Sequence, residues 1–191
     1  MDTAELKIYK YDDTYMCHMI QKCNVWSVLE CFLDEPEKPH QIRTISKKIG
    51  LATTSVKLHV NTLIQEQLVK EGKDIFKNYN ANFDNERFRF LKKINNLNKI
   101  ENSGLLEFLE EQIAPDVIIL FGSTAKGEDI STSDIDIFIQ SKQKKIDLSI
   151  YEKKLGRKIE LFIEDNLAQL PKELKNNIIN GQKLRGYLKI Y

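Results

Sequence analysis

Hydrophobic positions in the first third of the chain follow the spacing of α-helices. Residues 17–33 carry apolar side chains at i, i+3, i+4, i+7 and i+8, which predicts a helix with one buried face. Two prolines follow it and predict a turn. A shorter helix over residues 41–49 is expected to end at Gly50, and a third helix is expected over about residues 53–66.

The third predicted helix has an apolar and a polar face. Hydroxyl side chains at residues 53–55 are expected to cap its start, and the buried stripe is expected to be Val56, Val60, Leu63 and Ile64. After it, two short apolar runs flank residues 71–74, which predicts a β-hairpin. The polar face and the hairpin carry small polar or basic side chains at Thr54, Ser55, Lys57, Asn61, Lys73 and Lys77.

This order of elements resembles a winged helix-turn-helix of the MarR or ArsR type over roughly residues 17–80. The resemblance implies that the third helix enters the major groove of double-stranded DNA, and that the hairpin touches flanking phosphates. The six polar side chains named above are then the DNA-binding residues. Regulators of this kind commonly read two half-sites, so a homodimer is expected. Winged helices also dock proteins, and that alternative stays open.

Composition adds a modest electrostatic bias. The net charge is only +1. Residues 36–80 nevertheless hold eight bases against four acids, which favours a polyanionic partner there. No apolar run approaches the roughly 20 residues of a membrane span, the start lacks the pattern of a signal peptide, and three cysteines do not suggest a disulfide framework. We therefore expect a cytoplasmic protein without membrane contact.

A charged amphipathic helix is predicted over residues 84–100. Its apolar stripe is expected to be Phe90, Ile94 and Leu97, with Phe88 and Leu91 nearby. The helix either links two halves or pairs with a copy of itself. The predicted organisation is a winged-helix domain over 1–82, a linker helix over 83–104 and a second domain over 105–191.

The second domain contains the strongest chemical pattern. Residues 117–121 (VIILF) read as a strand buried on both faces, followed by a turn at Gly122 and Ser123. A second strand begins at Asp134, and alternation places Asp134 and Asp136 on one face, about 6.5 Å apart along the strand. Two carboxylates at that spacing favour a divalent cation between them. A glycine turn beside them lets backbone N–H groups approach a phosphate.

The stretch Phe121-Gly122-Ser123, ten residues, Asp134-Ile135-Asp136-Ile137 strongly resembles the signature of polymerase-β-like nucleotidyltransferases, in particular the minimal nucleotidyltransferases. The resemblance implies an α+β fold with a mixed sheet flanked by helices, and covers roughly residues 105–190. It implies a third carboxylate on a neighbouring strand, for which Glu160 in KIELFI is the candidate. The segment 178–188 (IINGQKLRGYL) echoes the ending of the family.

The resemblance implies transfer of NMP from an NTP, with ATP expected, to a hydroxyl acceptor such as a protein tyrosine on a partner toxin. Asp134 and Asp136 would hold Mg²⁺ or Mn²⁺, and Glu160 would act with Asp136 on the acceptor hydroxyl. Gly122, Ser123 and Lys126 would bind the nucleotide. Two positions depart from the family pattern: Glu160 stands where Asp is usual, and Lys126 stands where Arg is usual. With its DNA-binding domain, such an enzyme is expected to regulate its own synthesis in the manner of an antitoxin. The alternative is a winged-helix transcriptional regulator whose nucleotidyltransferase-like domain binds nucleotide without turnover.

Overall fold

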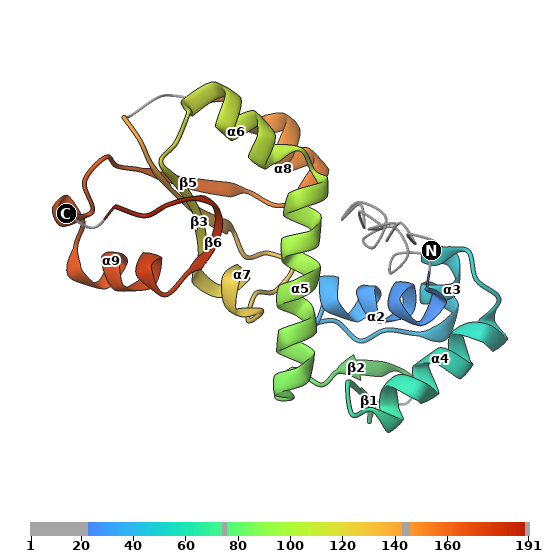
Figure 1. The fold of residues 1–191 in the computed structure, drawn as a ribbon. Helices are drawn as coiled ribbons and strands as arrows, with labels where there is room; N and C mark the ends of the chain where they lie inside the picture. The colour runs from blue at the N-terminus through green and yellow to red at the C-terminus, as the bar shows by residue number, and fades with distance from the viewer. Residues whose placement is uncertain (1–22, 74–75, 143–145, 190–191) are drawn as a thin grey trace, which may run out of the picture.

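The computed structural model describes residues 23–73, 76–142 and 146–189, which form a helical N-terminal half and a C-terminal half built on a sheet (Figure 1). The long helix α5 (Glu86–Asn102) stands between the halves and contacts both. The first six residues of the helix predicted over 17–33 lie outside the described residues. No helix formed by the described residues has the length and apolarity that crossing a membrane requires.

The N-terminal half packs three helices against a short hairpin. The predicted helices and hairpin are confirmed, and Gly50 adopts φ 71° where the second helix ends. The predicted hydroxyl cap of the third helix is wrong, because Ala52 occupies the cap position and no side chain caps it. A core centred on Phe32 and Val60 holds these elements together. Their bounds are α2 (Asn24–Asp34), α3 (Ile42–Ile49), α4 (Thr53–Gln65), β1 (Val69–Glu71) and β2 (Tyr79–Ala81).

Helix α5 exists as predicted, but its expected apolar stripe is wrong at two of its three positions, since only Leu97 packs against a core. Phe90 is 60% exposed and Ile94 is 38% exposed. The buried positions on this helix are Phe88, Lys92, Asn95, Asn96 and Ile100. Three of those five side chains are polar, because α5 packs between two halves that present backbone carbonyls and carboxylates to it.

The C-terminal half is a four-stranded mixed sheet in the order β5-β4-β3-β6. β3 pairs antiparallel with β4 and with β6, and β4 pairs parallel with β5. The mixed sheet flanked by helices is the α+β arrangement predicted for this half. Its strands are β3 (Val117–Phe121), β4 (Ile135–Gln140), β5 (Ile159–Ile163) and β6 (Gln182–Gly186), and its helices are α6 (Leu105–Ile113), α7 (Gly122–Lys126), α8 (Ser149–Leu155), the short 3-10 turn η1 (Leu167–Gln169) and α9 (Lys172–Ile179).

The two faces of the sheet have separate cores. One face, including Ile118 and Ile137, packs with residues of α5 and α6. The opposite face, including Phe121 and Phe138, packs with Ile178 of α9. Both faces of β3 are therefore covered, which explains why all five of its residues are buried. This alternation also decides which face each polar residue of β4 and β5 occupies.

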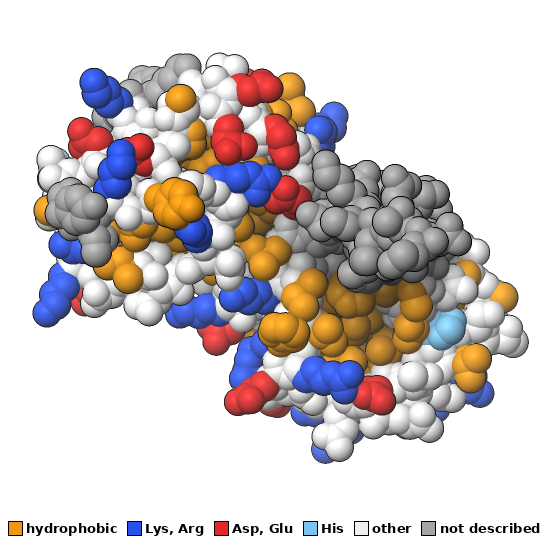
Figure 2. Space-filling view, viewed as in Figure 1, with side chains coloured by type: hydrophobic (Ala, Val, Ile, Leu, Met, Phe, Trp, Pro, Cys, Tyr) orange, Lys and Arg blue, Asp and Glu red, His pale blue; other side chains and the backbone are white. Residues whose placement is uncertain are grey.

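The surface of the two halves differs. Figure 2 shows positive and negative side chains mixed over the C-terminal half, whereas hydrophobic side chains gather over part of the N-terminal half. That half also has a hollow of about 620 Å³ with an apolar lining that includes Trp26, Leu29 and Leu91.

Candidate functional site

The turn after β3 brings the backbone into a sharply defined conformation. Phe121 ends the strand in an extended conformation, and Gly122 follows with φ 70°, which glycine adopts without strain. The short helix α7 begins at once and ends at Gly127. The predicted glycine turn opening a short helix is therefore confirmed. Ser123 is half-buried and Lys126 is exposed at the end of α7.

Strand register brings this turn next to two acids. Asp136 of β4 is the partner of Phe121 on one side and of Glu160 on the other. The neighbours of Glu160 in β5, Ile159 and Leu161, pack in the core on the α5 and α6 side. Alternation therefore puts Asp136 and Glu160 together on the opposite face, at the end of the sheet where α7 begins.

Gly122 leaves just enough room for Asp136. A β-carbon added to Gly122 would lie 2.1 Å from Oδ2 of Asp136, closer than any non-bonded contact permits. Only glycine at this position lets the carboxylate lie against the turn.

The electrostatic environment of Asp136 is unfavourable for its charge. Burial raises the pKa of its carboxyl above the usual range, and the carboxylates of Glu160 and then Asp134 raise it further. The guanidinium of Arg157 opposes this effect but does not reverse it. Three acids thus act on one another at a single location.

Asp134 lies one residue before β4, so the predicted second strand starts at Ile135 instead. Its backbone is firmly held: the carbonyl oxygen accepts hydrogen bonds from Thr124 Oγ1 at 3.1 Å and from Arg157 Nη2 at 3.0 Å. Thr124 belongs to α7, so the helix that follows the glycine turn also fixes the first acid.

The donor set suits a hard divalent cation. Asp134, Asp136 and Glu160 offer only carboxylate oxygens, the ligand type that Mg²⁺ prefers. Within the described ranges, no group of three or more His, Cys, Asp or Glu side chains is arranged to hold a metal ion by itself. Mg²⁺ in phosphoryl-transfer sites is commonly held by one or two carboxylates together with substrate phosphates, so two carboxylates can be enough for such a site.

A pocket of about 270 Å³ lies beside the turn. Gly122, Ala125 and Lys126 line one side of it, and Asn177, Asn180 and Gly181 line the other. Ser123 does not line this pocket. The amides on and just after α9 were not singled out from the sequence, because nothing in the local pattern of that helix shows that it returns to the turn. The only signal was the resemblance of segment 178–188 to a family ending.

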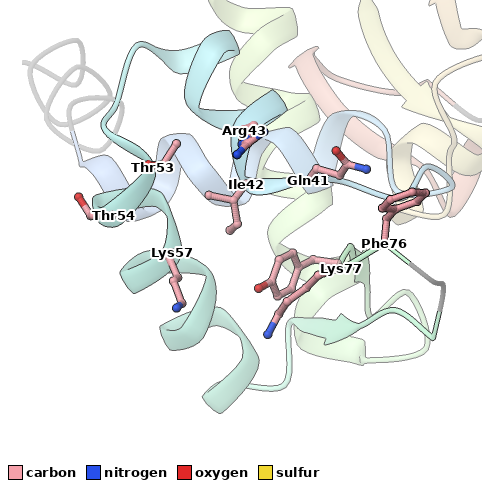
Figure 3. Close-up of a pocket in the computed structure, with 9 residues that line it drawn as sticks. Gln41, Ile42, Arg43, Thr53, Thr54, Lys57, Phe76 and Lys77 are labelled. Carbon is pink, nitrogen blue, oxygen red and sulfur yellow. The ribbon is translucent and has the colours of Figure 1, made fainter.

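Another hollow, of about 480 Å³, lies on the N-terminal half between α3, α4 and the hairpin (Figure 3). Lys57 of α4 and Lys77 of the hairpin extend into the same space in Figure 3, and Arg43 lies above them at the start of α3. The predicted Thr54 also lines this hollow, and the sequence reasoning missed Gln41, Arg43, Thr53 and Phe76.

The other predicted DNA-binding residues lie outside that lining. Asn61 is exposed further along α4, Ser55 is half-buried, and Lys73 is exposed after β1.

Lys77, which lines the hollow, forms an ion pair with Glu71 at 3.1 Å, and the hydrogen bond between these side chains raises the pKa of the lysine. An anion at this hollow would compete with that carboxylate for Lys77.

Comparison with known proteins finds a similarity in the C-terminal half. No curated protein matches the chain. A family model described as Polymerase beta, Nucleotidyltransferase matches residues 104–185, the segment that carries the glycine turn, the three acids and the pocket beside them. Residues 104–185 are therefore similar to nucleotidyltransferases of the polymerase-β type.

Proposed function

We propose that this chain is a divalent-metal-dependent nucleotidyltransferase that transfers NMP from an NTP, preferably ATP, to a hydroxyl acceptor. The observation that carries the proposal is the register of Asp136, which is paired with Phe121 before the glycine turn and with Glu160 on β5. This register supports one reaction centre made of a phosphate-binding turn and converging acids.

In the proposed reaction the turn binds the triphosphate. The backbone N–H group of Gly122 and the ammonium group of Lys126 would face the phosphates, with Asn177 and Asn180 on the other wall of the pocket. The N–H group of Ser123 would approach them from the turn, outside the lining of the pocket. Lys126 contributes a point charge, where arginine would give a two-pronged contact.

Asp134 and Asp136 would hold the metal ion, which when bound supplies positive charge to the carboxylates and to the phosphate under attack. Glu160, with Asp136, accepts the proton of the acceptor hydroxyl. The acceptor oxygen bonds to the α-phosphorus, the bond from that phosphorus to the bridging oxygen breaks, and pyrophosphate leaves.

The test is incubation with each of the four NTPs, labelled in the α-phosphate, with Mg²⁺ and hydroxyl acceptors. We expect label transfer by the wild type and none by Asp134→Ala/Asp136→Ala. A matched double variant, Asp116→Ala/Asp165→Ala, removes two exposed acids elsewhere and should keep transfer. Transfer that persists without Asp134 and Asp136 contradicts the proposal, and nucleotide binding with no transfer favours the non-catalytic regulator.

We also propose that the N-terminal half is a winged helix that binds double-stranded DNA. The hollow lined by Arg43, Lys57 and Lys77 supports this, because three basic residues and two threonines line one space between a helix and a hairpin. Helix α4 would supply the contacts to base edges and the hairpin those to phosphates. Salt-dependent binding to duplex DNA tests it, and binding to a protein with no DNA affinity would favour the docking alternative.

A further inference from the structure

The loop from Glu128 to Asp134 connects α7 to β4 and delivers the first acid of the site. Residues far apart in the chain bind this loop from several directions. These contacts join the N-terminal half, α5 and the C-terminal half around one short segment.

Asp129 is the centre of the contacts. Its side chain is 1% exposed. Oδ2 lies 3.2 Å from Lys92 Nζ and accepts a hydrogen bond from Arg157 Nη1 at 2.7 Å, while Oδ1 accepts one from Asn96 at 2.8 Å. A buried carboxylate needs this many donors to stay charged.

Arg157 links that buried carboxylate to the backbone of the site. Its Nε donates to the carbonyl oxygen of Ser133 at 2.6 Å, and its Nη2 donates to the carbonyl oxygen of Asp134 at 3.0 Å and to Thr124 Oγ1 at 2.8 Å. The planar, rigid guanidinium group of Arg157 thereby fixes two consecutive carbonyl groups, those of Ser133 and of Asp134 itself.

Lys92 links Asp129 to the N-terminal half. The same Nζ donates to the carbonyl oxygen of Leu33, at the end of α2, at 2.5 Å. A second contact comes from Glu37, in the segment after α2, whose carboxylate accepts hydrogen bonds from the backbone N–H and the hydroxyl of Ser131. The N-terminal half therefore holds the loop at two points.

We propose that Asp129 and Arg157 are positioning residues for the nucleotidyltransferase site, and that Lys92 and Glu37 make the placement of Asp134 depend on the N-terminal half. The effect on the reaction rests on the proposed function, whereas the effect on the loop does not. None of these four residues touches the nucleotide in this scheme. Their hydrogen bonds and ion pairs hold the loop and the backbone that carries Asp134.

Hydrogen exchange in the full-length chain tests the placement of the loop. Arg157→Lys keeps the charge but loses the fork, and we expect the amides of residues 129–134 to exchange about tenfold faster. The matched control is Arg185→Lys, which alters another arginine with several carboxylate partners, away from the loop, and should leave exchange there within about twofold.

Two acids that follow α2 test the role of the N-terminal half without disturbing a buried charge. Glu37→Ala removes the contact with Ser131, whereas Glu35→Ala, two positions earlier, removes ion pairs with Lys38 and with Lys48 of α3. We expect faster exchange of the Ser131 amide in the first variant alone. We also expect Glu37→Ala to raise the Mg²⁺ concentration for half-maximal transfer several-fold, with little change in the thermal midpoint.

The outcomes separate the two proposals. The positioning proposal is overturned if the loop amides of Arg157→Lys and Glu37→Ala exchange no faster than those of their controls. This holds whether or not the protein transfers label. Faster exchange with an unchanged Mg²⁺ requirement also overturns it, because the loop would then move without affecting the site. If the wild type transfers no label, the proposed function fails and the exchange data alone decide the positioning of the loop.

Discussion

Gly122 and Asp136 fit together so closely that a β-carbon on the glycine would lie 2.1 Å from the carboxylate oxygen Oδ2. The glycine also has φ 70°, so any side chain there is doubly disfavoured. The turn and the acid are thus one packed unit, although fourteen positions separate them in the sequence.

Gly122→Ala should abolish most transfer, because displacement of Asp136 by about 1 Å can cost about a hundredfold in rate. The matched control is Gly156→Ala. Gly156 has a similar φ of 66°, but no atom lies within 4 Å of the added carbon, so that variant should lose some stability and keep transfer. The measurement is the rate of label transfer by each variant. Equal rates would contradict the inference that a β-carbon at position 122 displaces Asp136.

The raised pKa of Asp136 predicts a trade between stability and activity. The ordinary pKa of an aspartate is 3.8, and the pKa of Asp136 in the folded chain is higher. Between the unfolded pKa and the folded pKa, the free energy of unfolding falls as pH rises. The reason is that the unfolded chain has released a proton that the folded chain retains. Asp136→Asn should therefore raise the thermal midpoint at pH 7, with a smaller gain at pH 4, while abolishing transfer.

Thermal unfolding in the presence of a chelator measures this effect. Asp165→Asn serves as the control because it removes one exposed carboxylate outside the site, and its midpoint should barely change. A lower midpoint for Asp136→Asn at pH 7 would show that the acids do not repel one another in the folded chain.

The amide of Asn177 is expected to contact the nucleotide. Asn177→Ala should raise the KM for NTP about tenfold, the order expected when one hydrogen bond to a charged group is lost. Asn176→Ala changes the same residue type on the same helix, outside the lining of the pocket, and should leave KM unchanged. An equal rise of KM in both variants would mean that the substitutions disturb the folding of α9 and that Asn177 makes no specific contact with the nucleotide.

Two lysines are expected to neutralise phosphates of bound DNA. Lys57→Ala and Lys77→Ala should each weaken binding to duplexes of any sequence and reduce the slope of log affinity against log salt by about 1. Lys153→Ala, which removes an exposed lysine of α8, should change neither quantity. Binding titrations at four or five salt concentrations measure the slope, and a slope unchanged in both variants would argue against this face.

The true buried face of α5 predicts a contrast between two phenylalanines. Phe88 is fully buried, so Phe88→Ala should cost about 3–5 kcal/mol of unfolding free energy. Phe90 is 60% exposed, so Phe90→Ala should change it by less than about 0.5 kcal/mol. Denaturant unfolding compares the two variants. A large loss of unfolding free energy in Phe90→Ala would mean that Phe90 is buried, as the sequence predicted.

The sequence predicted most elements because their signals are local. The continuous apolar run of β3, the glycine at the start of α7 and the periodic apolar residues of α4 are each readable within a few positions. The spacing of Gly122, Asp134 and Asp136 likewise indicated the chemistry, because a short connection forces the turn and the strand to be neighbours.

The buried face of α5 could not be read in this way. Hydrophobic spacing assigns the apolar side of a helix to the core, yet Lys92 and Asn96 are buried here and Phe90 is not. The partners of Lys92, which are Leu33 and Asp129, lie 59 and 37 positions away from it in the chain, and Asp129 lies 33 positions from Asn96. A polar residue becomes favourable in an interior only when such distant groups satisfy it.

The sequence by itself determined the candidate acids and the turn, because residue type and short-range spacing carry that information. Tertiary structure decided that Glu160 is the register partner of Asp136, that Asn177 faces the turn, and that Arg157 holds the loop before Asp134. These relations depend on strand pairing and on hydrogen bonds between distant segments, and no local pattern encodes either, because their free energy exists only once the chain has folded.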